Sequence, residues 1–387
     1  MDEDEADFGE KMVPVIIDTE EKCDLLFEAI KNEPIVSMDT EFVWSRSYYP
    51  LIGVIQIGVS PEKSYLFDAA KMNECPQSFK TFLENENIMK VCHDAYQDIQ
   101  IINYYAKTTS KNIFDTQLAA AFMGYGRAIS LSEMVEKICG KNLTKTQTLT
   151  NWLKRPLTDA QMEYALDDVR YLSECANFLI KRTKEKYVFE WILEDCQELS
   201  QISEPFSLTS AVARSYSREL QSVQFKNRKK LYRLCFAVEN MARSKNLPRS
   251  FLFKPGQLAQ IINCNPENQE NLKKTSLSPK VIARYSEFIL SSIRDENIPI
   301  DDELIEKSRY YQNKNAVQIG DMTKEIAVTL DKIAQDNEIC SSTVYNRKQL
   351  TELVRQTLEN KSPAVLHGWR NVFFGGVWND FWAEKLK

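Results

Sequence analysis

The segment PIVSMDTEFV at residues 34–43 decides the fold. Its apolar and β-branched residues predict a strand in a hydrophobic core. Asp39 and Glu41 are separated by one residue, so in a strand they point to the same face. Two neighbouring carboxylates repel each other unless the strand has already run out into solvent or a cation lies between them. In the second case they form half of a metal site, and such a site needs further carboxylates later in the chain.

The next segments extend this strand into a sheet. LIGVIQIGV at 51–59 and SYLFDA at 64–69 are short, apolar and bounded by residues that break regular structure. Three strands with short connections predict an antiparallel meander. The segments IMKVC at 88–92 and NIF at 112–114 each lead into a helical pattern. We therefore expect an α/β domain, with a mixed sheet and flanking helices, over residues 13–203.

Beyond the sheet, from about residue 158, the sequence predicts helices. The segments at 200–207 and 292–303 contain proline and are the expected linkers. They divide the helical part into two small bundles, at 208–292 and 300–387. At the other end of the chain, the acidic residues 1–12 are expected to form a disordered tail.

The composition excludes several classes of protein. The 387 residues contain no apolar stretch near the ~20 residues that a membrane span needs, and the acidic N-terminus does not resemble a signal peptide. The nine cysteines lack Cys-x-x-Cys spacing, which indicates free thiols and a cytoplasmic protein. Because only two histidines are present, His93 and His367, a divalent ion would be held by oxygen atoms. Oxygen ligands favour magnesium or manganese.

The net charge of −6 is an average of opposite charges. Residues 1–205 contain 21 Lys and Arg against 35 Asp and Glu, whereas residues 206–292 contain 15 against 5. A strongly basic module in an acidic chain favours binding of nucleic-acid phosphates over a merely solvated helix face. Lys229, Lys230 and Arg233 are our candidates for these contacts.

Two later stretches supply the additional carboxylates. VCHDAYQDIQ contains Asp94 and Asp98, four residues apart and thus on one face of an expected helix. EYALDDVRYL contains Asp167 and Asp168, and the second of these lies one helical turn after Tyr164. Carboxylates that hold two divalent ions about 4 Å apart are a known device for displacement at phosphorus. The spacing alone leaves open which member of each aspartate pair takes part.

The order of these motifs resembles the DEDD exonucleases of the tyrosine subclass. The stretches DTEFVWSRSYYPLIGVIQIG, FDTQLAAAFMG and LTKTQTLTNWLKRPLTDAQMEYALDDVRYL resemble bacterial ribonuclease D. The resemblance covers essentially the full length. Residues 208–292 resemble the HRDC (helicase-and-ribonuclease-D C-terminal) fold, and the end of the chain resembles a second, more divergent copy. The fold implied is a ribonuclease-H-like α/β exonuclease domain followed by two all-α HRDC-like bundles.

The resemblance also implies roles for the residues of the site. Asp39 would bridge two divalent ions, Mg²⁺ or Mn²⁺. Glu41 and Asp168 would complete the first ion's ligands, and Asp98 would hold the second. Tyr164 would position the attacking water. The spacing in the family favours the second aspartate of each pair described above.

Other residues have both a functional and a structural interpretation. Asp115 matches the family, but we expect it to cap the following helix rather than bind metal. Tyr49, like the tyrosine before it, could stack on a base or close the core as a turn aromatic. Gln56 and His93 could contact the substrate or bond within the protein. Phe42 is a further candidate for substrate binding.

The resulting hypothesis is a metal-dependent 3′-5′ exoribonuclease that releases nucleoside 5′-monophosphates. The resemblance connects it with precursors of tRNA and small structured RNAs, and we expect a monomer with no membrane association and no organic cofactor. A DNA 3′-5′ exonuclease is an alternative that uses the same acids, since only contacts to the 2′-hydroxyl separate the two. A catalytically silent nucleic-acid-binding scaffold is a third possibility, but it would not need a self-repelling acid cluster.

Overall fold

The computed structural model describes most of the chain. The described residues are 15–143, 150–202, 206–309 and 316–386. The expected acidic tail at 1–12 lies outside them, as do residues 144–149 of the longest quoted motif. None of the described helices is long and apolar enough to cross a membrane.

The chain forms two compact units that do not follow the sequence order. The first contains residues 1–43, 51–205 and 323–387, and the second contains residues 44–50 and 206–322. The tip of the first predicted hairpin therefore belongs to the helical unit. Each unit is described by itself below.

The first unit contains a mixed sheet of six strands in the order β1-β4-β3-β2-β5-β6. The strands are β1 (Ile16–Ile17), β2 (Ile35–Val43), β3 (Leu51–Gly58), β4 (Ser64–Phe67), β5 (Met89–Cys92) and β6 (Ile113–Asp115). Strands β2, β3 and β4 pair antiparallel, so the predicted meander is confirmed. Strands β1, β5 and β6 pair parallel to their neighbours. The α/β class predicted from the sequence is also confirmed.

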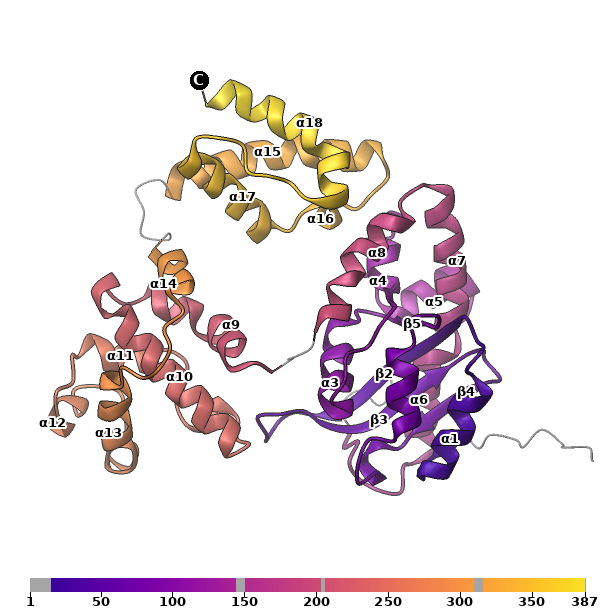
Figure 1. Ribbon diagram of the computed structural model, residues 1–387, viewed down its shortest axis with the longest axis horizontal. Coiled ribbons are helices and arrows are strands. Elements are labelled where there is room, and N and C mark those ends of the chain that lie inside the picture. Colours follow the sequence, from indigo (N-terminus) through magenta and orange to yellow (C-terminus); the bar gives the residue numbers. More distant parts are fainter. Residues whose placement is uncertain (1–14, 144–149, 203–205, 310–315, 387) are drawn as a thin grey trace, which may run out of the picture. The chain divides into compact units, whose positions relative to one another are not determined.

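Helices cover both faces of this sheet (Figure 1). Met38, Ile55 and Phe67 face a core that also contains residues of the helices α1, α2 and α3. Val54 and Leu66 face the opposite side, where they pack against residues of α6. The α-helices of this domain are α1 (Glu20–Ala29), α2 (Gln77–Glu84), α3 (Tyr96–Ala106), α4 (Thr116–Phe122), α5 (Leu131–Cys139), α6 (Asp159–Arg170), α7 (Leu172–Glu185) and α8 (Phe189–Gln197).

Two glycines of β3 let the α6 side of the domain approach the sheet closely. A Cβ atom at Gly53 would lie 2.5 Å from the carbonyl oxygen of Trp152, and one at Gly58 would lie 2.7 Å from that of Val169. Real Cβ atoms do not tolerate such distances, so both positions require glycine. Since Val169 directly follows Asp168, Gly58 sets how near this carboxylate comes to the sheet.

A buried ion pair fixes the segment that leads into α6. Arg155 donates from Nε to Asp68 at 2.7 Å, and the Asp68 side chain is only 3% exposed. The same guanidinium donates to the carbonyl oxygens of Trp152 at 2.7 Å and Gly53 at 3.0 Å. Because removing one partner would leave a buried charge unpaired, this pair firmly specifies the path of the chain.

The helical unit is built around one apolar cluster. Leu231, Cys235 and Ile289 are fully buried in it, and Tyr48 from the hairpin tip is part of it. Ile305 also packs there, so the helix after the expected linker at 292–303 belongs to this core. The helices of the helical unit, which cluster together in Figure 1, are α9 (Leu208–Gln221), α10 (Arg228–Ser244), α11 (Gln257–Asn263), α12 (Gln269–Leu272), α13 (Pro279–Arg294) and α14 (Asp302–Arg309).

The last helices pack on the exonuclease domain through α8. The Trp369 ring stacks on Trp191 with centroids 5.2 Å apart and an angle of 12°. Arg370 donates to both carboxylate oxygens of Asp195, at 2.7 and 3.0 Å. These helices are α15 (Ala316–Asp336), α16 (Ser341–Val344), α17 (Arg347–Asn360) and α18 (Gly368–Lys385). The short 3₁₀ helices are η1 (Ala69–Lys71), η2 (Leu199–Gln201), η3 (Phe225–Asn227) and η4 (Arg249–Phe251).

The close approach at Gly58 predicts that Gly58→Ala lowers the free energy of unfolding by about 1–3 kcal/mol, the usual effect of overpacking. Urea denaturation measures the change. Gly376→Ala is the matched control, because a Cβ atom there meets nothing within 4 Å. The control should be neutral or slightly stabilising. Equal stability of Gly58→Ala and wild type would contradict the close contact with α6.

Candidate active site

Four acidic side chains from three elements lie near one another. Strand β2 carries Asp39 and Glu41, α3 carries Asp98 and α6 carries Asp168. Burial raises the pKa of Asp39 well above its usual range, and the charges of the other three acids raise it further. Burial raises the pKa of Glu41 to about 8, again with contributions from Asp168 and Asp98. The structure thus brings together all four carboxylates predicted from the sequence.

The choice between Asp94 and Asp98 follows from the backbone. Helix α3 begins at Tyr96, and Asp94 lies before it in a turn with φ of 61°. The expectation that Asp94 and Asp98 share a helical face is therefore wrong. Asp98 is buried and accepts a hydrogen bond from the hydroxyl of Thr40, the residue between the two acids of β2. Mainly because of burial, its pKa rises to about 7.

Asp167 and Asp168 differ in their partners. Asp167 lies 2.6 Å from Arg170, which also binds Glu163 at 2.6 Å. Asp167 is therefore neutralised within its own helix. Burial raises the pKa of Asp168 to about 7, with Asp167 and Asp98 adding to the effect. Asp168 is thus the member of the pair that faces the other acids.

Tyr164 precedes Asp168 by one turn of α6. Its ring packs against Trp152, with centroids 6.1 Å apart. Trp152 is fully buried and belongs to the apolar cluster that contains Val54 and Leu66. This packing restricts the orientation of the tyrosine ring on α6.

Gln56 lies directly opposite Asp39 in the pairing of β2 with β3. Residues in such a pair share one face of the sheet, so the amide lies beside the carboxylate. Gln56 is fully buried, yet neither its Nε2 nor its Oε1 has a hydrogen-bond partner in the described part of the chain. Since an unsatisfied buried amide costs roughly 1–3 kcal/mol, the site is suited to a polar ligand.

The donor set can be tested against a divalent metal. Four carboxylates are hard oxygen ligands, and a cation would relieve the repulsion that raises their pKa values. Over the described ranges, no three His, Cys, Asp or Glu side chains are close enough to form a ready coordination shell. The donor chemistry therefore fits a divalent ion, whereas the repelling side chains would have to rotate toward it.

Asp115 and His93 are held within the protein. The Asp115 carboxylate accepts the backbone N–H groups of Gln117 at 2.8 Å and Leu118 at 3.3 Å, so its predicted role as a helix cap is confirmed. Both ring nitrogens of His93 also have partners: Thr116 Oγ1 at 2.9 Å and a carbonyl oxygen at 2.9 Å. These contacts favour the structural interpretation of His93, and burial lowers its pKa.

Tyr49 lies in the helical unit rather than beside the acids. Its hydroxyl accepts a hydrogen bond from Arg243 at 3.0 Å, and its backbone N–H donates to Asn246 at 3.1 Å. Its ring also meets Phe206 edge to face, with centroids 5.6 Å apart. These contacts favour the turn-aromatic interpretation. Phe42, in contrast, directly follows Glu41 on β2 and is half-buried.

The three candidates for phosphate contact differ in exposure. Lys229 and Lys230 are exposed at the start of α10, and Lys229 pairs with Asp302 at 2.8 Å. Arg233 is half-buried, one turn further along the same helix. The two lysines are therefore better placed than the arginine to meet a polyanion.

The raised pKa values predict an unusual stability profile in EDTA. Between about pH 5 and 8 the folded protein retains protons on Glu41, Asp98 and Asp168 that the unfolded chain, with carboxyl pKa near 4, has released. The free energy of unfolding should therefore fall as the pH rises through this window. Asp39→Asn removes one repelling charge, so the melting temperature of this variant should fall less steeply with increasing pH than that of the wild type. Parallel curves for the two proteins would contradict this electrostatic coupling.

Comparison with known proteins gives consistent matches. The 3′-5′ exonuclease family matches residues 14–184, and the HRDC domain family matches residues 228–293. A ribonuclease D of Desulfotalea psychrophila is 30% identical over 372 residues, which are 94% of this chain and 96% of that protein. A ribonuclease D of Nitrobacter hamburgensis is 30% identical over 89% of each chain.

A solved structure shows the same fold. Escherichia coli RNase D, described as an exoribonuclease involved in structured RNA processing, superposes with a TM-score of 0.83. The superposition covers 96% of this chain and 99% of that chain, at 23% identity. The fold predicted from the resemblance, an exonuclease domain followed by a helical HRDC region, is thereby confirmed. With a relative 30% identical over nearly its whole length, this chain belongs to the ribonuclease D family of 3′-5′ exoribonucleases.

Proposed function

We propose that this exoribonuclease releases nucleoside 5′-monophosphates one at a time by a two-metal-ion mechanism. The observation that carries the proposal is a set of four buried carboxylates with raised pKa values, three of which raise the pKa of the fourth, Asp39, beside the unpartnered amide of Gln56. Its proposed substrates are tRNA precursors and small structured RNAs with 3′ extensions. We further propose that it acts as a cytoplasmic monomer. Of the range 300–387 expected to form a second, divergent HRDC domain, we propose this role for α15–α18, because α14 packs with the first helical bundle.

Asp39, Glu41 and Asp168 would hold one Mg²⁺ or Mn²⁺ ion, and Asp39 and Asp98 would hold the second. When bound, the two ions activate a water and stabilise the leaving oxygen of the phosphodiester. The hydrogen bond from Thr40 holds Asp98 in the direction of β2. All four carboxylates must be ionised to act as ligands. Because their pKa values are raised, metal binding should release protons near neutral pH.

Tyr164 would orient the attacking water through its hydroxyl, and its ring keeps a fixed place because it packs on Trp152. The amide of Gln56 would bond to the terminal phosphate or to a water beside it. Phe42 would contact the terminal nucleotide from the end of β2. His93 would act indirectly, by holding the turn before α3.

The decisive experiment uses RNA and DNA oligomers labelled at either end, with magnesium or manganese. We expect a 5′-labelled RNA to shorten stepwise and a 3′-labelled RNA to release a labelled mononucleotide. Asp39→Asn should be inactive while keeping its fold, since the amide keeps the side-chain volume but loses the charge. Preferential shortening of DNA would favour a DNA exonuclease. Binding without cleavage by wild type would favour a silent scaffold.

A second prediction separates positioning from metal binding. Tyr164→Phe removes only the hydroxyl, so the cleavage rate should fall by roughly one to three decades, a range typical of a positioned hydrogen-bonding group. The magnesium concentration for half-maximal rate should stay nearly unchanged. If that concentration shifted as much as the rate, Tyr164 would order the site rather than the water.

A third prediction concerns recruitment of the substrate. The acidic first 205 residues should repel RNA beyond about 8–10 Å, whereas the basic residues 206–292 should attract it. Lys229→Glu with Lys230→Glu should weaken binding of a tRNA precursor and flatten the dependence of log K on log salt, measured with calcium to block turnover. Lys137→Glu with Lys181→Glu changes the charge equally at exposed sites of the exonuclease domain. Equal salt slopes for both double variants would contradict a role of this basic surface.

A further inference from the structure

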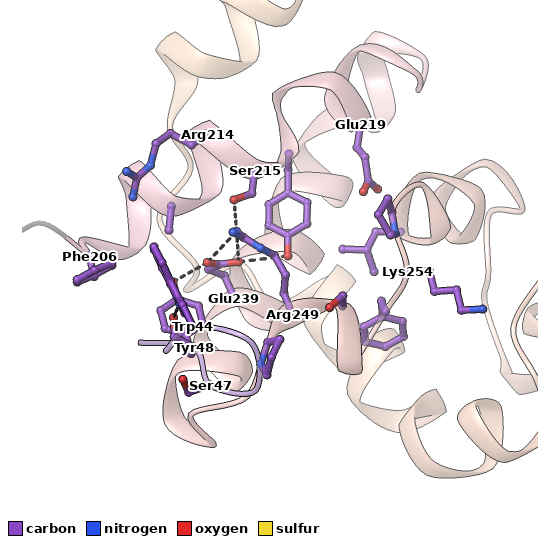
Figure 2. A pocket seen from close by; sticks show the side chains of 17 residues that line it. Trp44, Ser47, Tyr48, Phe206, Arg214, Ser215, Glu219, Glu239, Arg249 and Lys254 are labelled. Carbon is purple, nitrogen blue, oxygen red and sulfur yellow. Dashed lines mark hydrogen bonds and ion pairs between the residues drawn. The ribbon is translucent and has the colours of Figure 1, made fainter. Parts of the chain in front are cut away.

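The helical unit contains a pocket of about 670 Å³ that the proposed catalysis does not use. The hairpin tip (Trp44–Pro50) lines one part of it, and residues of α9, α10 and the segment before α11 line the rest. Figure 2 shows this arrangement. Small-molecule sites typically have volumes of roughly 300–1,000 Å³, so one or two nucleotides fit here.

An aromatic wall forms one side of the pocket. The indole of Trp44 is 41% exposed, and its Nε1 donates to the carbonyl oxygen of Tyr48 at 2.8 Å. The ring of Phe206 meets it edge to face, with centroids 5.9 Å apart. Both rings lie on the same side of the pocket in Figure 2. An indole held in a fixed orientation is a suitable platform for stacking of a nucleobase.

The two acidic residues of the pocket already have hydrogen-bond partners, and one of them is also paired with a cation. Glu239 is fully buried and accepts hydrogen bonds from the hydroxyls of Tyr48 at 2.5 Å and Tyr216 at 3.2 Å. Arg249 also pairs with it, at 3.3 Å. Glu219 accepts backbone N–H groups at the start of α11, at 3.0 and 3.2 Å. The ion pair therefore balances the charge of Glu239, whereas Glu219 keeps its charge beside the start of α11.

Two cationic residues of the pocket, unlike its acidic residues, have no partner for their side chains among the described residues. Arg214 and Lys254 are exposed, and within the described part of the chain their side chains form no hydrogen bond or ion pair. They lie on opposite sides of the pocket, with Arg249 between them (Figure 2). Arg249 uses only Nη1 toward Glu239, and its side chain is 47% exposed. Arg214 and Lys254 thus supply positive charge on two sides of the pocket, whereas Glu239 balances the charge of Arg249.

We propose that this pocket binds a short single-stranded segment of the RNA substrate, with one base stacked on Trp44 and phosphates at Arg214 and Lys254. The inference rests on the proposed function for the nature of the ligand. Cationic side chains on opposite sides of the pocket suit a chain with successive phosphates better than a free mononucleotide. Trp44 is three residues after Glu41, a chain length of at most about 11 Å. The pocket residue Trp44 therefore lies on the direct continuation of the chain segment that carries two of the acids.

The test compares two arginines of one helix. Arg214 and Arg218 are both exposed and one turn apart on α9, but only Arg214 lines the pocket. With calcium in place of magnesium, Arg214→Glu should weaken binding of a fluorescent single-stranded oligoribonucleotide at least about tenfold, as expected for a lost charge-assisted hydrogen bond. Arg218→Glu should change it much less. If both variants lost the same affinity for the oligoribonucleotide, the proposal would be overturned, because the loss would then reflect net charge alone.

The stacking wall is tested by a second pair of variants. Trp44→Ala should weaken binding roughly 5- to 150-fold, the range for loss of one stacked base, and Trp44→Phe should restore most of the affinity. Melting temperatures check that both variants keep the fold. In parallel, RNA with 4-thiouridine at successive positions should crosslink to peptides that contain Trp44 or Phe206. Absence of these crosslinks from an RNA that binds normally would overturn the proposal.

Two further experiments identify the kind of ligand and test the proposed function independently of the pocket. Adenosine monophosphate and inorganic phosphate should compete poorly with the oligoribonucleotide. If either competed as well as unlabelled oligoribonucleotide, the proposal that the pocket binds an RNA chain would be overturned. Wild-type hydrolysis of the p-nitrophenyl ester of thymidine 5′-monophosphate tests the catalytic site alone, because this substrate holds a single nucleotide. If that ester and RNA both resist hydrolysis while RNA still crosslinks to Trp44, only the proposed function fails.

Discussion

Repulsion between buried carboxylates is the constraint on which the rest of this structure depends. Burial and the charges of neighbouring carboxylates raise the pKa values of Asp39, Glu41, Asp98 and Asp168, so each element that buries them does so at a cost in stability. The framework must therefore be rigid. Strand pairing fixes two of the acids, and the close contact of Gly58 with α6 fixes a third.

The strand that carries two of the acids also helps to build the helical unit. Strands β2 and β3 end in the hairpin tip, whose Tyr48 is buried among the helices and donates to Glu239. Asn246 accepts the backbone N–H groups of Tyr48 and Tyr49, at 3.0 and 3.1 Å. A change in the packing of this tip therefore acts on the covalent continuation of the catalytic strand. The helical unit and two of the acids are thus connected by one continuous stretch of chain.

Patterns local in sequence could be predicted, because they depend on neighbouring residues only. Three short apolar segments with short connections predict the meander, and the position of Asp115 before a helical segment predicts its role as a cap. The two-residue strand β1 has too little pattern to be recognised. The turn at Asp94 was missed because its positive φ depends on Asp115, which lies far along the chain and binds that turn's backbone N–H groups. The grouping of residues 44–50 with the helices likewise depends on contacts with residues far along the chain, so the local sequence does not predict it.

For the site, the sequence shows which residues carry charge but not which charges are already paired. Asp167 and Asp168 are equivalent by composition, and only the ion pair with Arg170 distinguishes them. Two polar residues of the site can be recognised in the sequence: a glutamine in an apolar strand, Gln56, and a threonine between two acids, Thr40. Their roles appear only when strand pairing places the amide beside Asp39 and packing directs the hydroxyl to Asp98 of α3. Polar groups that the fold leaves unsatisfied, or satisfies across long sequence separations, are therefore the ones that identify a site.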